Sequence, residues 1–180
     1  MIRVIGGTYK GKRLAKVPSP LVRPMPDKLK EALFNSIHEH IRGAWCLDGF
    51  SGTGSVGIEA LSRGAERVVF VDEYYPAIKV IKKNIGKCGA EEKSIVIRKE
   101  FNRAVIHLSK ENLKFDIIFL DPPYKLLDER NPLKVIKKRG ILKEGGMIIL
   151  RHYFKTRFEP KFFELKRQMS MGDDRISFYK

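Results

Sequence analysis

The spacing of hydrophobic residues divides the chain, from about residue 44 onward, into alternating short strands and helices. Apolar runs rich in β-branched and aromatic residues are WCLDGF (45–50), RVVFVD (67–72), SIVIRKE (94–100), FDIIFLD (115–121) and GGMIILRHY (145–153). Apolar residues recur at helical spacing in the segments between them, at about 54–63, 77–86, 103–108 and 132–140. This alternation predicts an α/β fold with a mostly parallel sheet and helices on both of its faces.

Both ends of the chain depart from this alternation. Residues 2–7 (IRVIGG) and 12–17 (KRLAKV) are two short β-like pieces around a Gly/Lys turn, and residues 23–41 predict one helix opened by Pro26 and Asp27. At the other end, FFELKRQMS (162–170) and RISFYK (175–180) follow each other with no helix between them, which predicts an antiparallel hairpin. We therefore expect a basic N-terminal extension at 1–43 and a main domain at 44–180.

Composition narrows the class of protein. A chain of 180 residues can bury a real core as one domain. Its 36 basic and 21 acidic residues give a net charge of +15, which favours a polyanionic partner such as nucleic acid. Cys46 and Cys88 lie far apart with no metal-ligand spacing, so we expect reduced thiols, no bound metal and an intracellular protein. No apolar stretch approaches the length of a membrane span or a signal peptide, which indicates a cytoplasmic location.

A glycine-rich stretch follows the first predicted strand of the main domain. In LDGFSGTGSVG (47–57), Gly52, Gly54 and Gly57 have the spacing G-x-G-x-x-G, and Asp72 lies 20 residues beyond Gly52, at the end of the next strand. This arrangement is typical of a nucleoside cofactor site in which the acid holds ribose hydroxyls. The alternative is that the glycines only form a tight strand-to-helix turn.

The choice of cofactor depends on Asp48. A dinucleotide needs positive potential for its pyrophosphate, whereas Asp48 places a carboxylate four residues before Gly52. S-adenosylmethionine carries an ammonium and a sulfonium group, and a neighbouring carboxylate favours both charges. The sequence therefore favours S-adenosylmethionine, with its ribose held by Asp72.

The stretch FLDPPY (119–124) supplies a candidate catalytic group. Proline fixes its own φ and restricts the residue before it, so Asp121 and Pro122 should be extended and stiff. The Asp121 carboxylate and the Pro122 carbonyl oxygen could accept the two N–H bonds of a nucleobase amine and turn its lone pair toward a methyl donor. Tyr124 offers a ring on which the base could stack. The alternative is that these residues only end a strand.

The chain resembles, from end to end, the bacterial small-subunit ribosomal RNA guanine-N2 methyltransferases of the RsmD type. The resemblance is carried by RVIGGTYKGKRL (3–14), RPMPDKLKEALFNSI (23–37), LDGFSGTGSVGIEALSRGA (47–65), VVFVDEY (68–74) and FLDPPY (119–124). It implies a class I, Rossmann-like methyltransferase fold and transfer of one methyl group from S-adenosylmethionine to N2 of a guanine in 16S ribosomal RNA. We further expect the protein to meet this RNA within an assembling or assembled 30S particle, with naked RNA as the alternative, and to act as a monomer.

The resemblance also assigns roles to residues. The catalytic motif would be Asp121, Pro122, Pro123 and Tyr124. The cofactor would contact Asp48, Phe50, Ser51, Gly52, Thr53, Gly54, Asp72, Glu73, Tyr74, Glu100 and Phe101. Departures from the family pattern include Met25, which stands where a threonine is usual, Glu100, which stands where an aspartate is common, and Met171, which stands where a tyrosine is common.

The basic residues of the extension are predicted to contact RNA, because phosphate contacts dominate affinity for nucleic acid. The candidates are Arg3, Lys10, Lys12, Arg13 and Arg23. Competing functions explain less of the sequence. A dinucleotide-dependent oxidoreductase leaves DPPY and the extension without a role, and a non-catalytic RNA-binding module leaves the glycine loop without one. An amino-methyltransferase acting on another RNA, or on adenine N6 of DNA, shares the chemistry, but 180 residues leave little room for a DNA target-recognition region.

Overall fold

The computed structural model describes residues 1–180 apart from residues 21, 124–125, 128–130 and 157–160. Its centre is a seven-stranded sheet in the order β5-β4-β3-β6-β7-β9-β8. The five strands β3 to β7 are parallel, and β9 and β8 form the antiparallel hairpin at one edge. The strands are β3 (Trp45–Gly49), β4 (Arg67–Asp72), β5 (Ser94–Arg98), β6 (Phe115–Leu120), β7 (Leu142–Tyr153), β8 (Leu165–Met171) and β9 (Asp174–Tyr179). The predicted fold class, including the hairpin, is confirmed.

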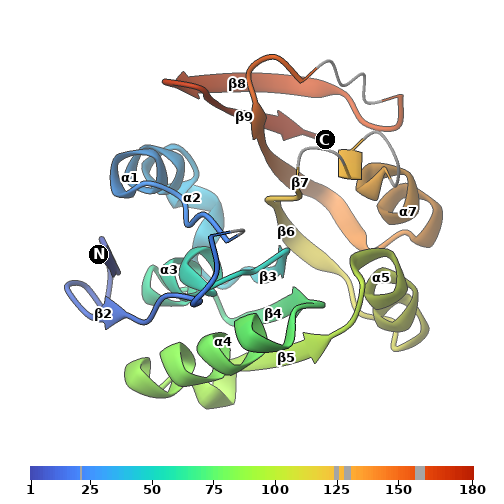
Figure 1. Ribbon diagram of the computed structural model, residues 1–180. Coiled ribbons are helices and arrows are strands. Elements are labelled where there is room, and N and C mark those ends of the chain that lie inside the picture. The colour runs from blue at the N-terminus through green and yellow to red at the C-terminus, as the bar shows by residue number, and fades with distance from the viewer. Residues whose placement is uncertain (21, 124–125, 128–130, 157–160) are drawn as a thin grey trace.

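Helices cover both faces of the sheet (Figure 1). They are α1 (Asp27–Ser36), α2 (His38–Ile41), α3 (Ser55–Ser62), α4 (Tyr75–Cys88), the 3₁₀ turn η1 (Glu91–Lys93), α5 (Phe101–Lys110) and α7 (Pro132–Arg139). Successive strand residues point to opposite faces, so Val68 and Phe70 pack with α1, α3 and α4, whereas Val69 and Val71 pack with α5 and α7. Burial on both faces explains why these parallel strands are continuous apolar runs.

The N-terminal extension packs on the same face of the sheet as α3 and α4. Strands β1 (Ile2–Arg3) and β2 (Arg13–Leu14) pair antiparallel, as the sequence predicts. Their buried residues Ile2 and Leu14 join the same hydrophobic cluster as the sheet residue Cys46. The division at residue 43 stays a prediction, but the two segments share one core.

A buried carboxylate on α3 fixes the extension in place. The two oxygens of Glu59 accept the backbone N–H groups of Ile5 and Gly6, both at 2.8 Å. The same carboxylate lies 3.4 Å from the buried Lys30 ammonium and accepts a hydrogen bond from Arg63 Nε at 2.9 Å. A buried charge needs this many partners, so the extension is a docked part of the fold.

The helix expected at 23–41 is interrupted. It begins at Asp27 as predicted, but Ile37 has φ −120° and ψ 15°, which ends α1 and separates it from the short α2. The Ile37 side chain is nonetheless buried. The apolar pattern therefore continues through a residue whose backbone leaves the helix, which is why periodicity alone predicts one helix.

Candidate active site

Four acidic residues end up in a row along the carboxyl edge of the parallel strands. Glu100 follows β5, Asp72 ends β4, Asp48 is the second-last residue of β3 and Asp121 follows β6, and these four strands are neighbours in that order. The chain leaves β3 toward β4 on one side and returns to β6 on the other. Asp48 and Asp121 therefore flank the switch point of the sheet, where open α/β sheets bind their ligands.

Asp48 is buried beneath the glycine loop. Its Oδ2 accepts the backbone N–H of Gly57 at 2.9 Å, within the first turn of α3. Burial raises the pKa of Asp48 well above its usual range, and the Gly57 hydrogen bond opposes this rise. A side chain at Gly57 would place Cβ 2.3 Å from the Phe70 ring, so the helix can approach the sheet this closely only with glycine there. A carboxylate therefore stands at the helix N-terminus, where a dinucleotide fold receives pyrophosphate.

Asp72 joins the end of β4 to the glycine loop. Its Oδ2 accepts the N–H of Gly52 at 2.8 Å, and its Oδ1 accepts the N–H of Tyr74 at 2.9 Å. Burial raises the pKa of Asp72, while these two backbone donors lower it. Because an ionised carboxylate has about four acceptor positions, Asp72 retains acceptor capacity for a ligand hydroxyl.

Phe50 and Phe101 bring the loops after β3 and β5 together. Their rings stack with centroids 4.8 Å apart, and a Cβ on Gly49 would lie 2.5 Å from Phe101 Cε2. Phe50 has φ 61°, a strained value for a residue with a side chain, and such strain gathers at functional sites. Glu100 begins α5 as its N-cap, with Oε2 accepting the N–H of Arg103 at 3.0 Å.

The other predicted cofactor residues lie on the same loops. Ser51 is buried and ties β3 to β4, because its Oγ donates to the carbonyl oxygens of Asp48 and Val71 and accepts the N–H of Val71. Thr53 is buried as well, and Gly54 is the left-handed N-cap of α3. Glu73 and Tyr74 are exposed just beyond Asp72.

Asp121 is held by an arginine that the sequence analysis did not single out. Arg151 Nη1 donates to Asp121 Oδ2, and Arg151 Nε donates to Asp174 Oδ1, both at 2.9 Å. The Arg151 side chain is 10% exposed, whereas that of Asp121 is 31% exposed. Burial raises the pKa of Asp121, and the Arg151 guanidinium acts in the opposite direction. The carboxylate is thus fixed on one side and open on the other.

A narrow cavity of about 10 Å³ lies between Asp48 and Asp121. Its wall includes Arg151 and, from the extension, Met25 and Leu33. Val22 also approaches the glycine loop, because a Cβ on Gly52 would lie 3.0 Å from Val22 Cγ1. The extension therefore forms part of the candidate site, and Met25, in the place of the usual threonine, presents an apolar side chain to it.

The DPPY motif is described only in part. Asp121, the buried Pro122 and the exposed Pro123 are described, and Tyr124 lies outside the described residues. Among the predicted RNA contacts, Lys10, Arg13 and Arg23 are exposed. Two others are engaged within the protein. Arg3 Nε pairs with Asp27 at 3.0 Å, and Lys12 Nζ donates to the carbonyl oxygen of Lys87 at 2.9 Å, near the end of α4.

Asn84 is a second residue that the sequence analysis missed. It is buried on α4, where its Oδ1 accepts the N–H of Ala15 and its Nδ2 donates to the carbonyl oxygens of Ala15 and Thr53. It thereby ties the extension to the glycine loop. The signal was present in the sequence, because Asn84 stands within the apolar stripe of Ile78, Ile81 and Ile85. Arg151 gave a similar signal as a charge directly after the apolar run 147–150.

Comparison with known proteins places the chain in a family. The model of the family described as "Conserved hypothetical protein 95" matches residues 2–180. "Ribosomal RNA small subunit methyltransferase D" of Haemophilus influenzae is 32% identical over 149 residues, which cover 82% of this chain and 76% of that protein. The chain belongs to this family, the RsmD family.

A further relative and a solved structure support the assignment of the chain to the RsmD family. The Bacillus subtilis protein named "Putative rRNA methyltransferase YlbH" is 40% identical over 151 residues, which cover 84% of this chain and 82% of that protein. A solved structure titled "Putative methyltransferase yhhF from Escherichia coli" has a TM-score of 0.81 at 29% identity, and the match covers 99% of this chain and 96% of that chain. The resemblance seen in the sequence is confirmed.

Neither a membrane-spanning helix nor a metal site is found among the described residues. None of the helices there combines the length and the apolar character needed to cross a membrane. In the same residues, no group of three or more His, Cys, Asp or Glu side chains is arranged to hold a metal ion.

Proposed function

We propose that the protein transfers a methyl group from S-adenosylmethionine to the exocyclic N2 amine of a guanine in small-subunit ribosomal RNA. The main structural support for this proposal is the placement of Asp48, Asp72 and Asp121 at the ends of three neighbouring strands, across the switch point of the sheet. The names of the RsmD relatives support methyl transfer to ribosomal RNA of the small subunit.

The residues present fit S-adenosylmethionine better than a dinucleotide. Gly52 and Gly54 have φ values of 55° and 74°, which gives the tight loop that a nucleoside cofactor needs, and Asp72 keeps acceptor positions for ribose hydroxyls. The Gly57 N–H, which would otherwise meet a phosphate, already serves Asp48. A pyrophosphate at this point would face a buried carboxylate, whereas an ammonium or a sulfonium would gain from it.

We assign the two ends of the cofactor by this arrangement. Asp48 and the loop from Phe50 to Gly54 would line the methionine half, Asp72 would hold the ribose, and Glu73, Tyr74, Glu100 and Phe101 would line the adenine side. When bound, S-adenosylmethionine supplies an electrophilic methyl carbon on a sulfonium that leaves as a neutral thioether. The residues of this chain need only place the target amine and favour its charge in the transition state.

Asp121 would do so by accepting an N–H of the guanine amine, with the Pro122 carbonyl oxygen accepting the second one. These bonds turn the nitrogen lone pair away from the ring and toward the methyl group. The N–C bond would form as the C–S bond breaks, and the extra proton on the methylated nitrogen would pass to Asp121 or to solvent. Tyr124 would stack on the base, a contact worth roughly 1–3 kcal/mol. Only the ionised carboxylate of Asp121 accepts hydrogen bonds without donating one, so this step requires Asp121 to be deprotonated.

Arg151 would act as a positioning residue for this step. It holds one oxygen of Asp121 at 2.9 Å and is itself oriented by Asp174 from the other side. Burial raises the pKa of Asp121 and the Arg151 guanidinium acts against this rise, so the arginine favours the ionised carboxylate. The arginine thereby fixes both the direction and the charge of the acceptor.

The physiological setting is part of the same proposal. We propose that the substrate is the RNA within an assembling or assembled 30S particle and that the protein acts as a cytoplasmic monomer without a metal ion. The net charge of +15 fits a substrate rich in phosphate.

The test is transfer of labelled methyl groups to three substrates: unmodified small subunits, naked small-subunit RNA and duplex DNA. We expect label in ribosomal RNA and none in DNA. Calorimetric titration with S-adenosylmethionine and with NAD, in parallel, should give binding of the first alone. Preferential binding of NAD, or label in DNA alone, would contradict the proposal.

A further inference from the structure

The outer face of α5 carries a basic groove in which only Glu100 has a role in the proposed chemistry. The groove has a volume of about 380 Å³ and runs from the end of β5 along α5. We call it the α5 groove, and the polar residues that line it are Arg98, Lys99, Glu100, Arg103, His107 and Lys110. Four of these six carry a fixed positive charge and one carries a carboxylate.

The cations of the α5 groove are unpaired within the described part of the chain. Lys99, Arg103 and Lys110 are exposed, and their side chains take part in none of the ion pairs found there. Arg98 lies over the Tyr75 ring at 5.0 Å and its Nε donates to the carbonyl oxygen of Glu73 at 3.5 Å, and neither contact neutralises its charge. Glu100, the one acid, caps α5 through the N–H of Arg103. The groove therefore has a surplus of positive charge available to a partner.

The spacing of these residues fits an extended anion. Arg103, His107 and Lys110 are separated by four and three positions, so they share one face of α5 and span about 10 Å along its axis. Lys99 continues the row before the helix begins. A line of charges of this kind matches successive phosphates of a strand, whereas a single small anion would use only part of it.

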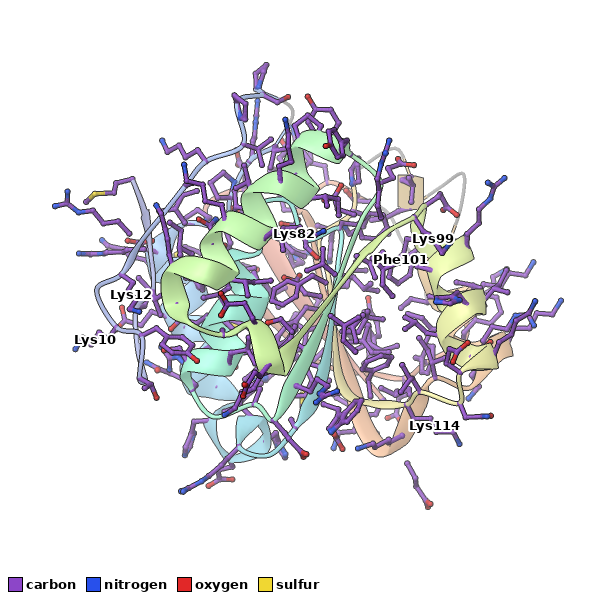
Figure 2. The ribbon with its side chains drawn as sticks, turned by 90° about the horizontal axis from the view of Figure 1, so that it is seen from below. Lys10, Lys12, Lys82, Lys99, Phe101 and Lys114 are labelled. Carbon is purple, nitrogen blue, oxygen red and sulfur yellow. The ribbon has the colours of Figure 1, made fainter. Side chains whose placement is uncertain are left out.

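The position of the α5 groove relates it to the candidate active site. Arg98 pairs in register with Asp72, and α5 begins at Phe101, which stacks on Phe50 of the glycine loop. The helix lies on the face of the sheet opposite to the N-terminal extension. In Figure 2, Lys99 lies on one side of the molecule and Lys10 and Lys12 on the other.

We propose that the α5 groove binds the phosphate backbone of the substrate RNA, on the opposite face of the sheet from the extension. The inference rests on the proposed function, in which RNA is the substrate. An RNA strand that crosses the carboxyl edge of the sheet meets the extension on one side of Asp121 and the α5 groove on the other. The extension is then one of two RNA-binding surfaces.

The test compares two triple variants that lose the same charge. The groove variant is Lys99→Ala, Arg103→Ala and Lys110→Ala. The control variant is Lys93→Ala, Lys114→Ala and Lys138→Ala, three exposed residues that precede β5, β6 and β7 and so lie at the amino edge of the parallel strands. Figure 2 shows Lys114 at the far end of α5 from Lys99. Binding of naked small-subunit RNA is measured across a salt series, together with the affinity for S-adenosylmethionine.

We expect the groove variant to lose RNA affinity on the order of tenfold to hundredfold at about 0.1 M salt, with a flatter slope of log affinity against log salt by about 2. The control variant should keep the wild-type slope, and both should keep their affinity for S-adenosylmethionine. Equal losses in the two variants would mean that net charge alone is responsible and would overturn the inference. So would a loss of S-adenosylmethionine affinity in the groove variant, because the groove would then serve the cofactor. If the wild-type protein binds no ribosomal RNA, the proposed function itself fails.

Discussion

Asp72 and Asp121 both follow a buried parallel strand, yet different groups hold their carboxylates. Asp72 accepts two backbone N–H groups, one from Gly52 in the loop after the neighbouring strand β3 and one from Tyr74, two residues further along the chain. Asp121 is held by the Arg151 side chain, 30 residues away on the neighbouring strand. Both kinds of donor lower the pKa of the carboxylate that they hold, but only the arginine also brings a positive charge to the site. The first arrangement suits a binding group and the second suits a group whose protonation state decides a rate.

The largest effect is expected at Asp121. Asp121→Ala should lower the single-turnover rate of methyl transfer by about 10²–10³-fold, because the acceptor that orients the amine is lost. RNA affinity should stay near that of the wild type, since the phosphate contacts lie elsewhere. Asp121→Asn retains an acceptor oxygen, so its rate should fall between that of the wild type and that of Asp121→Ala. A near-normal rate at saturating RNA would remove Asp121 from the proposed role.

Arg151 should affect the pH dependence of the methyl-transfer rate, whereas Asp72 should not. Without the guanidinium, burial raises the pKa of Asp121 further. Since activity requires the carboxylate, the low-pH limb of the rate profile should move to higher pH in Arg151→Met, by about 1–3 units. Arg151→Lys keeps the charge and should restore part of the shift. An unchanged pH profile in Arg151→Met, together with a lower rate, would show that the arginine is only structural.

Asp72 should affect binding more than rate. Asp72→Ala removes an acceptor for the ribose hydroxyls, which should weaken the binding of S-adenosylmethionine by about 1.5–3 kcal/mol in calorimetry. At saturating cofactor, its methyl transfer should recover and its pH profile should match that of the wild type. If the variant is folded and its methyl-transfer rate does not recover at saturating cofactor, then Asp72 does not act in cofactor binding alone, as we propose.

The smallest effects are expected in the extension. Lys10→Ala and Arg13→Ala should each flatten the slope of log RNA affinity against log salt by roughly 0.7–1. Lys12→Ala should change the slope less, because the Lys12 ammonium already donates to the Lys87 carbonyl oxygen. S-adenosylmethionine affinity is the control for all three. If the salt plots of the three variants superimpose on that of the wild type, the proposed RNA contacts of Lys10 and Arg13 are contradicted.

The different groups that hold Asp72 and Asp121 also explain how much of the site the sequence could predict. Asp48, Asp72 and Asp121 each stand at the end of an apolar run, and parallel strands bring such ends to one edge, so their proximity follows from the pattern alone. Arg151 also ends an apolar run. Its pairing with Asp121 depends on the register in which Leu120 lies opposite Leu150, and a sequence does not display this register.

Residues that join separate segments were the hardest to predict. Asn84 was visible as a polar residue in an apolar stripe, but its partners Ala15 and Thr53 lie 69 and 31 positions away. The charges of the extension were visible as well. Their number did not reveal that Arg3 and Lys12 are engaged within the protein. The α5 groove depends on α5 and the end of the edge strand β5 enclosing a concave surface, which the periodicity of each element alone does not specify.

The central claim is that this site methylates N2 of guanine. The most direct test is mass analysis of nucleosides from small-subunit RNA after incubation with labelled S-adenosylmethionine and either the wild-type protein or Asp121→Ala. We expect labelled N2-methylguanosine as the product of the wild type and almost none from the variant. Label on an adenine or a cytosine, or equal N2-methylguanosine from both proteins, would contradict it.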